Sequence, residues 1–372
     1  FEHMMFNGTS RLEPREFDRI MEANGGSNNA YTSKDVTVYQ DWFPRSALEV
    51  IFGLEGDRFQ NLDFDDEVIE SERGVVYSER RTRVDNDNMG RLYEQMLATV
   101  FVAHPYQFPV IGWPSDIENW TREDLEDFYR TYYAPNNLTL VVVGDVTAAE
   151  VYRLSEVYFG PIAAQDPPRD IRTVEPLQSG ERRITIEMDA QAPLLHVAFH
   201  AGRAGEARTL SMELLLNILV GGDSSRLHQR LVERDGLAIS VGGFRQESFD
   251  PGTVYFYLTP PPGGDPAAAE AALFDELARV VAEGVSESEL AKAKNIRLAD
   301  FWRELATIDG KAEAIARHEV FYGGYETLFE LPKRVDGVSL DALRTTAGQV
   351  FERNNATIGV LIAPAATGED ES

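Results

Sequence analysis

The sequence predicts an α+β fold built from two homologous domains, each a mixed β-sheet covered by helices. The chain has 372 residues, more than one hydrophobic core usually serves. Helical and strand-like patterns follow one another along the whole chain. A shift that places Thr121 on Ser339 also places Leu125 on Leu343. A helix, an Asn-Asn turn and an apolar strand therefore recur with one spacing, which indicates two copies of one α/β unit.

A proline-rich segment separates the two copies. The stretch from Gly160 to Arg182 holds four prolines among polar residues, which is typical of a linker. The sequence therefore predicts a first domain at 1–160, a linker at 161–182 and a second domain at 183–372.

In the first copy, each helix has a recognisable beginning or end. Pro14 lies at the start of one helical pattern and Gly25 follows its end. Thr121 lies in the N-cap position of another, with Asp124 near the capping-box position. The patterns predict helices at 14–23, 46–60, 65–83, 89–102 and 121–133, strands at 36–43 and 138–143, and a long ordered loop at 104–120.

The second copy repeats this plan. Its patterns predict strands at 183–188, 196–200, 238–246 and 253–259, helices at 207–220 and 224–234, and helical segments over 266–322. The shift that relates the copies places His3 on Gly221 and Glu79 on Arg297. The second copy therefore lacks any metal ligands that the first copy holds at these positions.

Charge and composition exclude several classes of function. The chain has 35 basic and 62 acidic residues, a net charge of −27, which disfavours nucleic acid or an anionic membrane as a partner. No apolar run approaches 18 residues. Only five residues are lysine, so the acidic surface indicates either adaptation to high salt or an ordinary acidic protein. With no cysteine, any zinc must be held by histidine and carboxylate.

A candidate metal motif stands at the beginning of the chain. Glu2 and His3 precede a short apolar run and Gly8, a pattern that reads as the second half of a helical His-x-x-Glu-His motif. Two histidines four apart share one helix face and reach one metal ion, and the Glu between them faces a metal-bound water. The first histidine of this motif would be the second residue upstream of Phe1.

A second signal comes from the predicted helix 65–83. Glu72 and Glu79 lie seven residues apart, about two turns, and so share roughly one face. The alternative is that both carboxylates decorate an acidic helix.

Together these motifs resemble the pitrilysin-type zinc metallopeptidases, the inverted zincins that include insulin-degrading enzyme and the mitochondrial processing peptidase. The resemblance continues through 25–33, 136–145, 221–227 and 236–238 and covers essentially the whole chain. It implies a clamshell of two domains around a chamber and a zinc endopeptidase acting on peptides or unfolded segments. His3 and Glu79 would be zinc ligands, and Glu2 would be the general base.

The resemblance implies roles for four further residues. Glu72 would orient a ligand of the metal or substitute for Glu79. Phe6 would line the pocket beside the scissile bond, although a role in the core fits equally well. Asn29 and Ala30 match a segment that pairs with the substrate backbone as an added strand.

One departure from the family pattern leads to two hypotheses about the subunit composition of the enzyme. Val232 and Ile239 stand where single-chain relatives place an arginine and a tyrosine, and neither can stabilise an oxyanion. A homologous partner subunit would then supply both groups. Alternatively, the enzyme uses Arg226 or Arg230 and works alone or as a homodimer.

The resemblance also leaves a non-catalytic subunit of the same fold as the alternative function. By resemblance to bacterial relatives, the protein is expected to be periplasmic or otherwise exported.

The remaining histidines have simpler interpretations. His196 and His200 share one face of a predicted strand, where they form a second metal site or, by default, pack or face solvent. His104 and His318 are expected in a loop and on a helix surface.

Overall fold

The structure, a computed structural model, describes residues 1–364. Its contacts define two compact units. Unit 1 consists of Phe1–Arg80, Val110–Arg172 and Glu304–Val320. Unit 2 consists of Arg81–Pro109, Thr173–Arg303 and the described residues from Phe321 onwards. The domain boundaries 1–160 and 183–372 follow the duplication in the sequence and stay a prediction, because units defined by contacts need not coincide with copies of a duplicated segment.

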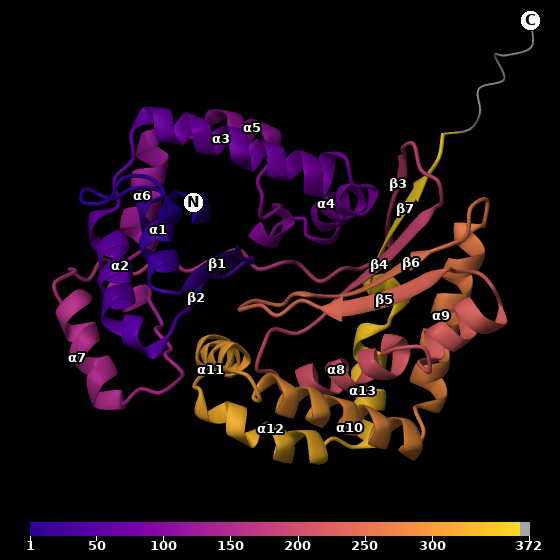
Figure 1. The fold of residues 1–372 in the computed structure, drawn as a ribbon. Helices are drawn as coiled ribbons and strands as arrows, with labels where there is room; N and C mark the ends of the chain where they lie inside the picture. The colour runs from indigo at the N-terminus through magenta and orange to yellow at the C-terminus, as the bar shows by residue number, and fades with distance from the viewer. Residues whose placement is uncertain (365–372) are drawn as a thin grey trace, which may run out of the picture. The chain divides into compact units, whose positions relative to one another are not determined.

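Unit 1 combines helices with a two-stranded antiparallel sheet of order β1-β2 (Figure 1). Its elements are η1 (Glu2–Phe6), α1 (Glu16–Ala23), β1 (Ser27–Thr32), β2 (Thr37–Trp42), η2 (Arg45–Ala47), α2 (Leu48–Asn61), α3 (Asp66–Arg80), α5 (Pro114–Asn119), α6 (Arg122–Tyr132), η5 (Pro135–Asn137), α7 (Ala148–Tyr158) and most of α11 (Ile308–Tyr322).

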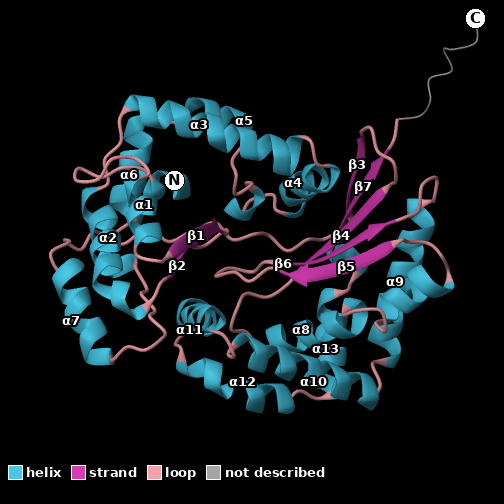
Figure 2. Cartoon of the chain, viewed as in Figure 1, coloured by secondary structure: helices cyan, strands magenta, loops and turns pink. Residues whose placement is uncertain are grey.

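Unit 2 contains a five-stranded mixed sheet of order β3-β7-β4-β6-β5 (Figure 2). Its elements are η3 (Arg81–Asp85), α4 (Asn88–Val100), η4 (Pro105–Gln107), β3 (Arg182–Glu187), β4 (Leu194–His200), α8 (Ala207–Val220), η6 (His228–Arg234), β5 (Ser240–Arg245), β6 (Thr253–Thr259), α9 (Pro266–Glu283), nearly all of α10 (Glu287–Glu304), α12 (Glu326–Asp336), α13 (Leu340–Val350), η7 (Arg353–Asn355) and β7 (Ala356–Ile362). Within residues 1–364, no helix has the length and apolar character needed to cross a membrane.

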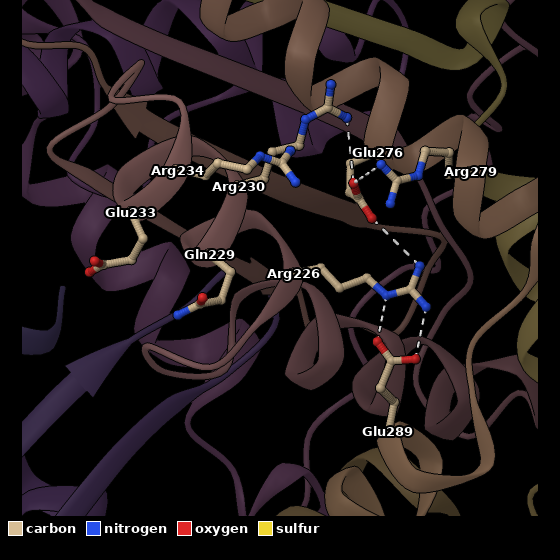
Figure 3. A pocket seen from close by; sticks show the side chains of 8 residues that line it. All are labelled: Arg226, Gln229, Arg230, Glu233, Arg234, Glu276, Arg279 and Glu289. Atoms are coloured by element: carbon tan, nitrogen blue, oxygen red, sulfur yellow. Dashed lines mark hydrogen bonds and ion pairs between the residues drawn. The ribbon is translucent and has the colours of Figure 1, made fainter.

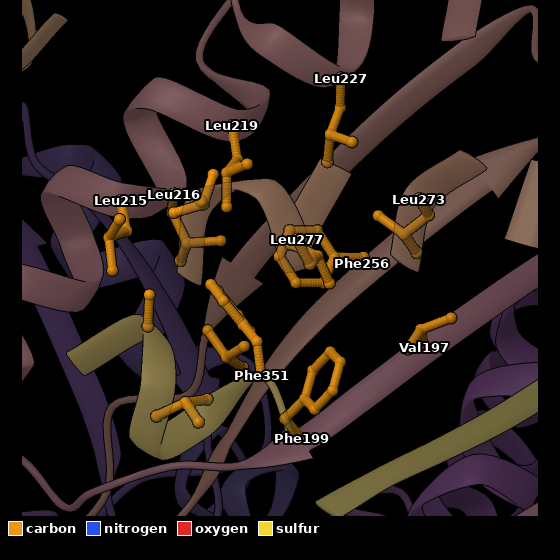
Figure 4. Packing of buried hydrophobic residues seen from close by; sticks show 14 of the residues in the cluster. Val197, Phe199, Leu215, Leu216, Leu219, Leu227, Phe256, Leu273, Leu277 and Phe351 are labelled. Atoms are coloured by element: carbon orange, nitrogen blue, oxygen red, sulfur yellow. The ribbon is translucent and has the colours of Figure 1, made fainter. Parts of the chain in front are cut away.

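The sheet of unit 2 is buried on both faces. Val197 and Phe199 of β4 point into a large core formed with α8, α9 and α13 (Figure 4). Leu194 and Ala198, on the opposite face of the same strand, pack against α4. Since successive side chains of a strand point to opposite faces, burial on both faces explains why β4 is apolar almost throughout.

Local contacts repeat in the two copies predicted from the sequence. Thr121 and Ser339 both cap a helix by accepting a backbone N–H three residues later. Asn137 donates to the Tyr132 carbonyl at 2.9 Å, and Asn355 donates to the Val350 carbonyl at 2.9 Å. Corresponding positions of the two copies thus hold similar residues that make the same contacts, which supports the α+β duplication.

The strand predicted at 138–143 does not form. The segment is irregular, whereas its counterpart in the second copy is β7, which pairs with β3 and β4. A strand requires neighbouring strands that satisfy its backbone groups, and among residues 1–364 no strand pairs with 138–143.

The structure also corrects the prediction of a loop at 104–120 and an expectation about the histidines. The loop predicted at 104–120 contains η4 and α5, both of which begin with a proline at the first helical position. His104 lies in a loop, as expected, and its side chain is buried, whereas His318, expected on a helix surface, is buried. His104 contacts the Asp250 carboxylate at 3.2 Å, a partner distant in sequence that no local pattern indicates.

The predicted linker has no helix or strand before its last residue, Arg182, where β3 begins, yet one of its other residues is anchored in unit 2. The Glu175 carboxylate accepts backbone N–H groups of Val102, Ala103 and His104 at 2.9 to 3.2 Å. Burial by itself would raise the pKa of Glu175, but these three donors bring that pKa below its usual value.

Candidate metal and catalytic site

The helix η1 presents Glu2 and His3. It is a 3₁₀ helix, and its next two residues, Met4 and Met5, are buried. Met4 packs with Phe64 and Ile69, and Met5 packs in a separate cluster with Leu48 and Phe52. The two methionines therefore anchor the segment, and the preceding polar pair remains partly exposed.

The helix α3 presents Glu72 and Glu79 to His3. Ile69 and Val76 are its buried apolar residues, seven positions apart, and each glutamate follows one of them by three residues. His3 Nδ1 lies 3.0 Å from Glu72 Oε2, and His3 Nε2 lies 3.4 Å from Glu79 Oε2. Three of the residues singled out in the sequence are thus brought together from segments about seventy positions apart.

Electrostatics favour the charged form of His3 in the absence of a metal. The hydrogen bond to Glu72 raises the pKa of His3 above its usual value, and the charges of Glu72, Glu79 and Glu2 act in the same direction. Burial opposes these effects but is outweighed.

The donor atoms fit zinc in part. Two ligands on a tetrahedral zinc, each about 2.0–2.2 Å from the metal, lie about 3.4 Å apart. The separation of His3 Nε2 and Glu79 Oε2 matches this edge. A carboxylate on the other ring nitrogen, here Glu72, is the arrangement that fixes a ligating imidazole. No group of three or more metal-binding side chains is formed among the described residues, so two donors are in place and a third is not.

Glu2 is held by a hydrogen bond from β1. The hydroxyl of Thr32, the last residue of β1, donates a hydrogen bond to Glu2 Oε2. Thr32 also lies 3.2 Å from the hydroxyl of Thr37 on β2. Sequence reasoning did not single out Thr32, although it lies only two positions after Ala30, because a threonine in a strand is ordinary.

Phe6 packs inside unit 1. Its ring contacts those of Phe17 and Tyr39, and the Arg58 guanidinium lies 5.5 Å from its centroid. Arg58 is buried against all three rings, at 4.7 Å from Phe17 and 4.6 Å from Tyr39, and pairs with Glu55. Phe6 therefore packs in the core, one of the two roles that the sequence left open for it. Arg58 is a buried cation, and its position on a helix gave no indication of this burial.

Asn29 and Ala30 lie in the middle of β1. Within the part of the chain that the structure describes, β1 pairs with β2 alone, so its other edge has no strand beside it. The β1–β2 pair also contacts α11, since Glu313 accepts hydrogen bonds from Tyr31 at 2.5 Å and from Gln40 at 3.1 Å. An edge strand of this kind can accept an extended peptide.

The arginines near Val232 are already paired. Arg226 makes a two-pronged contact with Glu289 at 2.6 and 2.8 Å (Figure 3). Arg230 lies 2.6 Å from Asp275. Both also contact the buried Glu276, in an open pocket of about 570 Å³. Because these charges are neutralised within unit 2, neither arginine is poised to stabilise an oxyanion. Val232 packs against the core, and Ile239 is 58% exposed.

Removal of the Glu289 charge is expected to destabilise unit 2 by about 1 kcal/mol, since the pair is partly exposed to solvent. The hydrogen bond from Arg226 lowers the pKa of Glu289 to about 2, which is below its unfolded value. This contribution is therefore complete above pH ~4.5 and is lost as the pH falls toward ~2. Glu289→Gln should lower the urea midpoint at pH 7 and have little effect near pH 2, whereas Glu287→Gln, an exposed change on the same helical turn, should have little effect at either pH. Equal losses at both pH values would contradict this assignment.

His196 and His200 do not assemble a second metal site among residues 1–364. His196 is buried and contacts the Tyr255 hydroxyl at 2.8 Å, and burial lowers its pKa to about 4. His200 packs edge-on against Phe101. Packing, the default interpretation, accounts for both.

Comparison with known proteins gives the family. Residues 1–112 match the Insulinase (Peptidase family M16) domain, and residues 119–297 match the Peptidase M16 inactive domain. A protein of Helicobacter pylori named zinc protease PqqE is 30% identical over 96% of this chain and 81% of its own length.

Two solved structures share the fold. A protease from Helicobacter pylori superposes with a TM-score of 0.93 at 27% identity, over 98% of this chain and 88% of that one. The first half of the periplasmic protease PqqL from Escherichia coli gives 0.77 at 20% identity, over 98% and 82%. The match spans nearly the whole chain at both the sequence and the fold level. This chain is a member of the insulinase family of peptidases, family M16.

Proposed function

We propose that this protein is a zinc-dependent endopeptidase subunit that hydrolyses peptides or unfolded polypeptide segments. The observation that carries the proposal is the convergence of His3, Glu72 and Glu79, with Glu2 adjacent to His3 in the chain. Relatives named zinc proteases agree with it.

In this proposal each residue has one task. His3 and Glu79 hold the metal, together with a histidine that the motif places before Phe1, and Glu72 fixes the His3 ring through Nδ1. A zinc ion held by these residues would lower the pKa of a bound water and would polarise the peptide carbonyl. Glu2 accepts the proton of the attacking water and passes it to the leaving amine. Asn29 and Ala30 hold the substrate as an added strand along the edge of β1, and Phe6 supports the site from the core.

The direct test uses the full-length protein. We expect it to bind one zinc, to cleave an unfolded fluorogenic protein substrate, to lose cleavage with a chelator and to regain it with zinc. Residues 1–372 alone should bind zinc weakly, because two protein ligands replace three. Stoichiometric zinc in this shorter chain would show that the motif is misplaced.

A non-catalytic subunit of the same fold is the second candidate. It is favoured by the match of residues 119–297 to a domain described as inactive, and by the aliphatic Val232 and Ile239. A full-length protein that binds no zinc and cleaves nothing, alone or with a homologous chain, would select this candidate.

We further propose that a homologous partner supplies an arginine and a tyrosine in place of Val232 and Ile239. The pairing of Arg226 with Glu289 and of Arg230 with Asp275 supports this, because it removes the nearest alternatives. Each missing oxyanion donor can cost about 3 kcal/mol of transition-state stabilisation. Full activity from the purified full-length chain alone would overturn the two-subunit arrangement.

Export to the periplasm is part of the proposal. Its support is that the Escherichia coli protein of the same fold is described as periplasmic. Fractionation of the native host, followed by detection of the protein in each fraction, tests it.

A further inference from the structure

We propose that the hydroxyl of Thr32, itself in contact with the hydroxyl of Thr37, positions the carboxylate of Glu2. The inference rests on the proposed function, in which Glu2 is the base. It assigns to Thr32 a positioning role in the reaction, because Thr32 is the residue that touches Glu2.

Two contacts connect β2 to Glu2. Thr37 Oγ1 lies 3.2 Å from Thr32 Oγ1, and Thr32 donates to Glu2. Thr32 and Thr37 are directly opposite each other on β1 and β2, so the sheet register fixes the contact between them.

The two contacts have only one consistent direction. A carboxylate contributes no proton, so Thr32 donates to Glu2 and must accept from Thr37. Hydrogen bonds that run in one direction polarise one another, which strengthens the bond from Thr32.

The strand β2 is anchored close to Thr37. Two positions further on, the Tyr39 hydroxyl lies 2.6 Å from the Tyr133 hydroxyl, and the Arg58 guanidinium lies 4.6 Å from the centre of the Tyr39 ring. Thr37 therefore lies on a strand that packing inside unit 1 holds in place.

The consequence for catalysis is orientation. A general base acts only when it lies within hydrogen-bond reach of the proton it accepts, and a displacement of about 1 Å can cost about 10²-fold in rate. Without the Thr32 hydroxyl, the Glu2 side chain is free to rotate away from the attacking water. Substrate binding along β1 does not depend on this hydroxyl.

The test compares Thr32→Val with Thr32→Ser in the full-length protein. Valine keeps the shape and removes the donor, so kcat should fall about 10–100-fold with KM nearly unchanged, and serine should restore most of it. Thr37→Val removes the second link and should give a smaller loss. Thr131→Val, a change at a partly exposed residue on α6, should give none. A normal kcat in Thr32→Val, or a failure of serine to restore it, would overturn the proposal.

A second measurement does not depend on activity. In crystals of the metal-free protein, Glu2 should occupy one position in the wild type and in Thr32→Ser, and several positions in Thr32→Val. An unchanged Glu2 in Thr32→Val would refute the positioning role whatever the kinetics. If the wild type cleaves no substrate, the proposed function fails, and the placement of Glu2 in these crystals still decides whether the Thr32 hydroxyl orients it.

Discussion

Glu2→Gln is expected to abolish peptide cleavage in the full-length protein while zinc stays bound. The amide has nearly the shape of the carboxylate and still accepts from Thr32, but it cannot take a proton from water. Removal of a general base typically costs ~10²–10⁴-fold, and the loss here should lie at the upper end or above it, because water activation depends on the same group. Single-turnover cleavage and metal analysis of the same preparation measure both effects.

The matched control for this change is Glu13→Gln, which neutralises an exposed carboxylate in the same N-terminal region. It should leave turnover and zinc content unchanged. Near-normal turnover in Glu2→Gln would show that another group acts as the base, and loss of zinc in this variant would place Glu2 among the metal ligands instead.

Glu79→Gln is expected to remove zinc, and with it all cleavage. A neutral amide is a much poorer zinc ligand than a carboxylate, and Glu79 Oε2 lies 3.4 Å from His3 Nε2, at the spacing of two ligands on one tetrahedral metal. Glu72→Gln should weaken zinc binding without removing it, because Glu72 contacts the other ring nitrogen of His3. Loss of such an orienting contact typically lowers metal affinity by about 10–100-fold rather than abolishing it.

Zinc titration of the two variants separates these roles, with Glu67→Gln, an exposed change on α3, as the control. If Glu72→Gln lost zinc as completely as Glu79→Gln, both carboxylates would be ligands. If neither variant lost zinc, the convergence of these side chains on His3 would be an ion-pair cluster of an acidic helix, the alternative that the sequence left open.

Much of the fold followed from local signals. The capping pair Thr121 and Asp124 begins a helix where expected, and β4 and β6 lie where apolar, β-branched and aromatic residues gather. The strand at 138–143 was wrong because its pattern resembles that of β7, while strand formation depends on neighbours. Pattern can predict that a segment prefers to be extended, but pairing partners decide whether it becomes part of a sheet.

The sequence by itself determined the family, the α+β class, the duplication and the identity of Glu2, His3, Glu72 and Glu79 as candidates, because these depend on residue types at fixed spacings along the chain. Only the tertiary structure decided which nitrogen of His3 faces which glutamate, that Arg226 and Arg230 are already neutralised, and that Thr32 joins β1 to Glu2. Each of these is a contact between segments distant in sequence. Such contacts are set by how helices and strands pack, which depends on the summed burial of many side chains and leaves no local signature in the residues that meet.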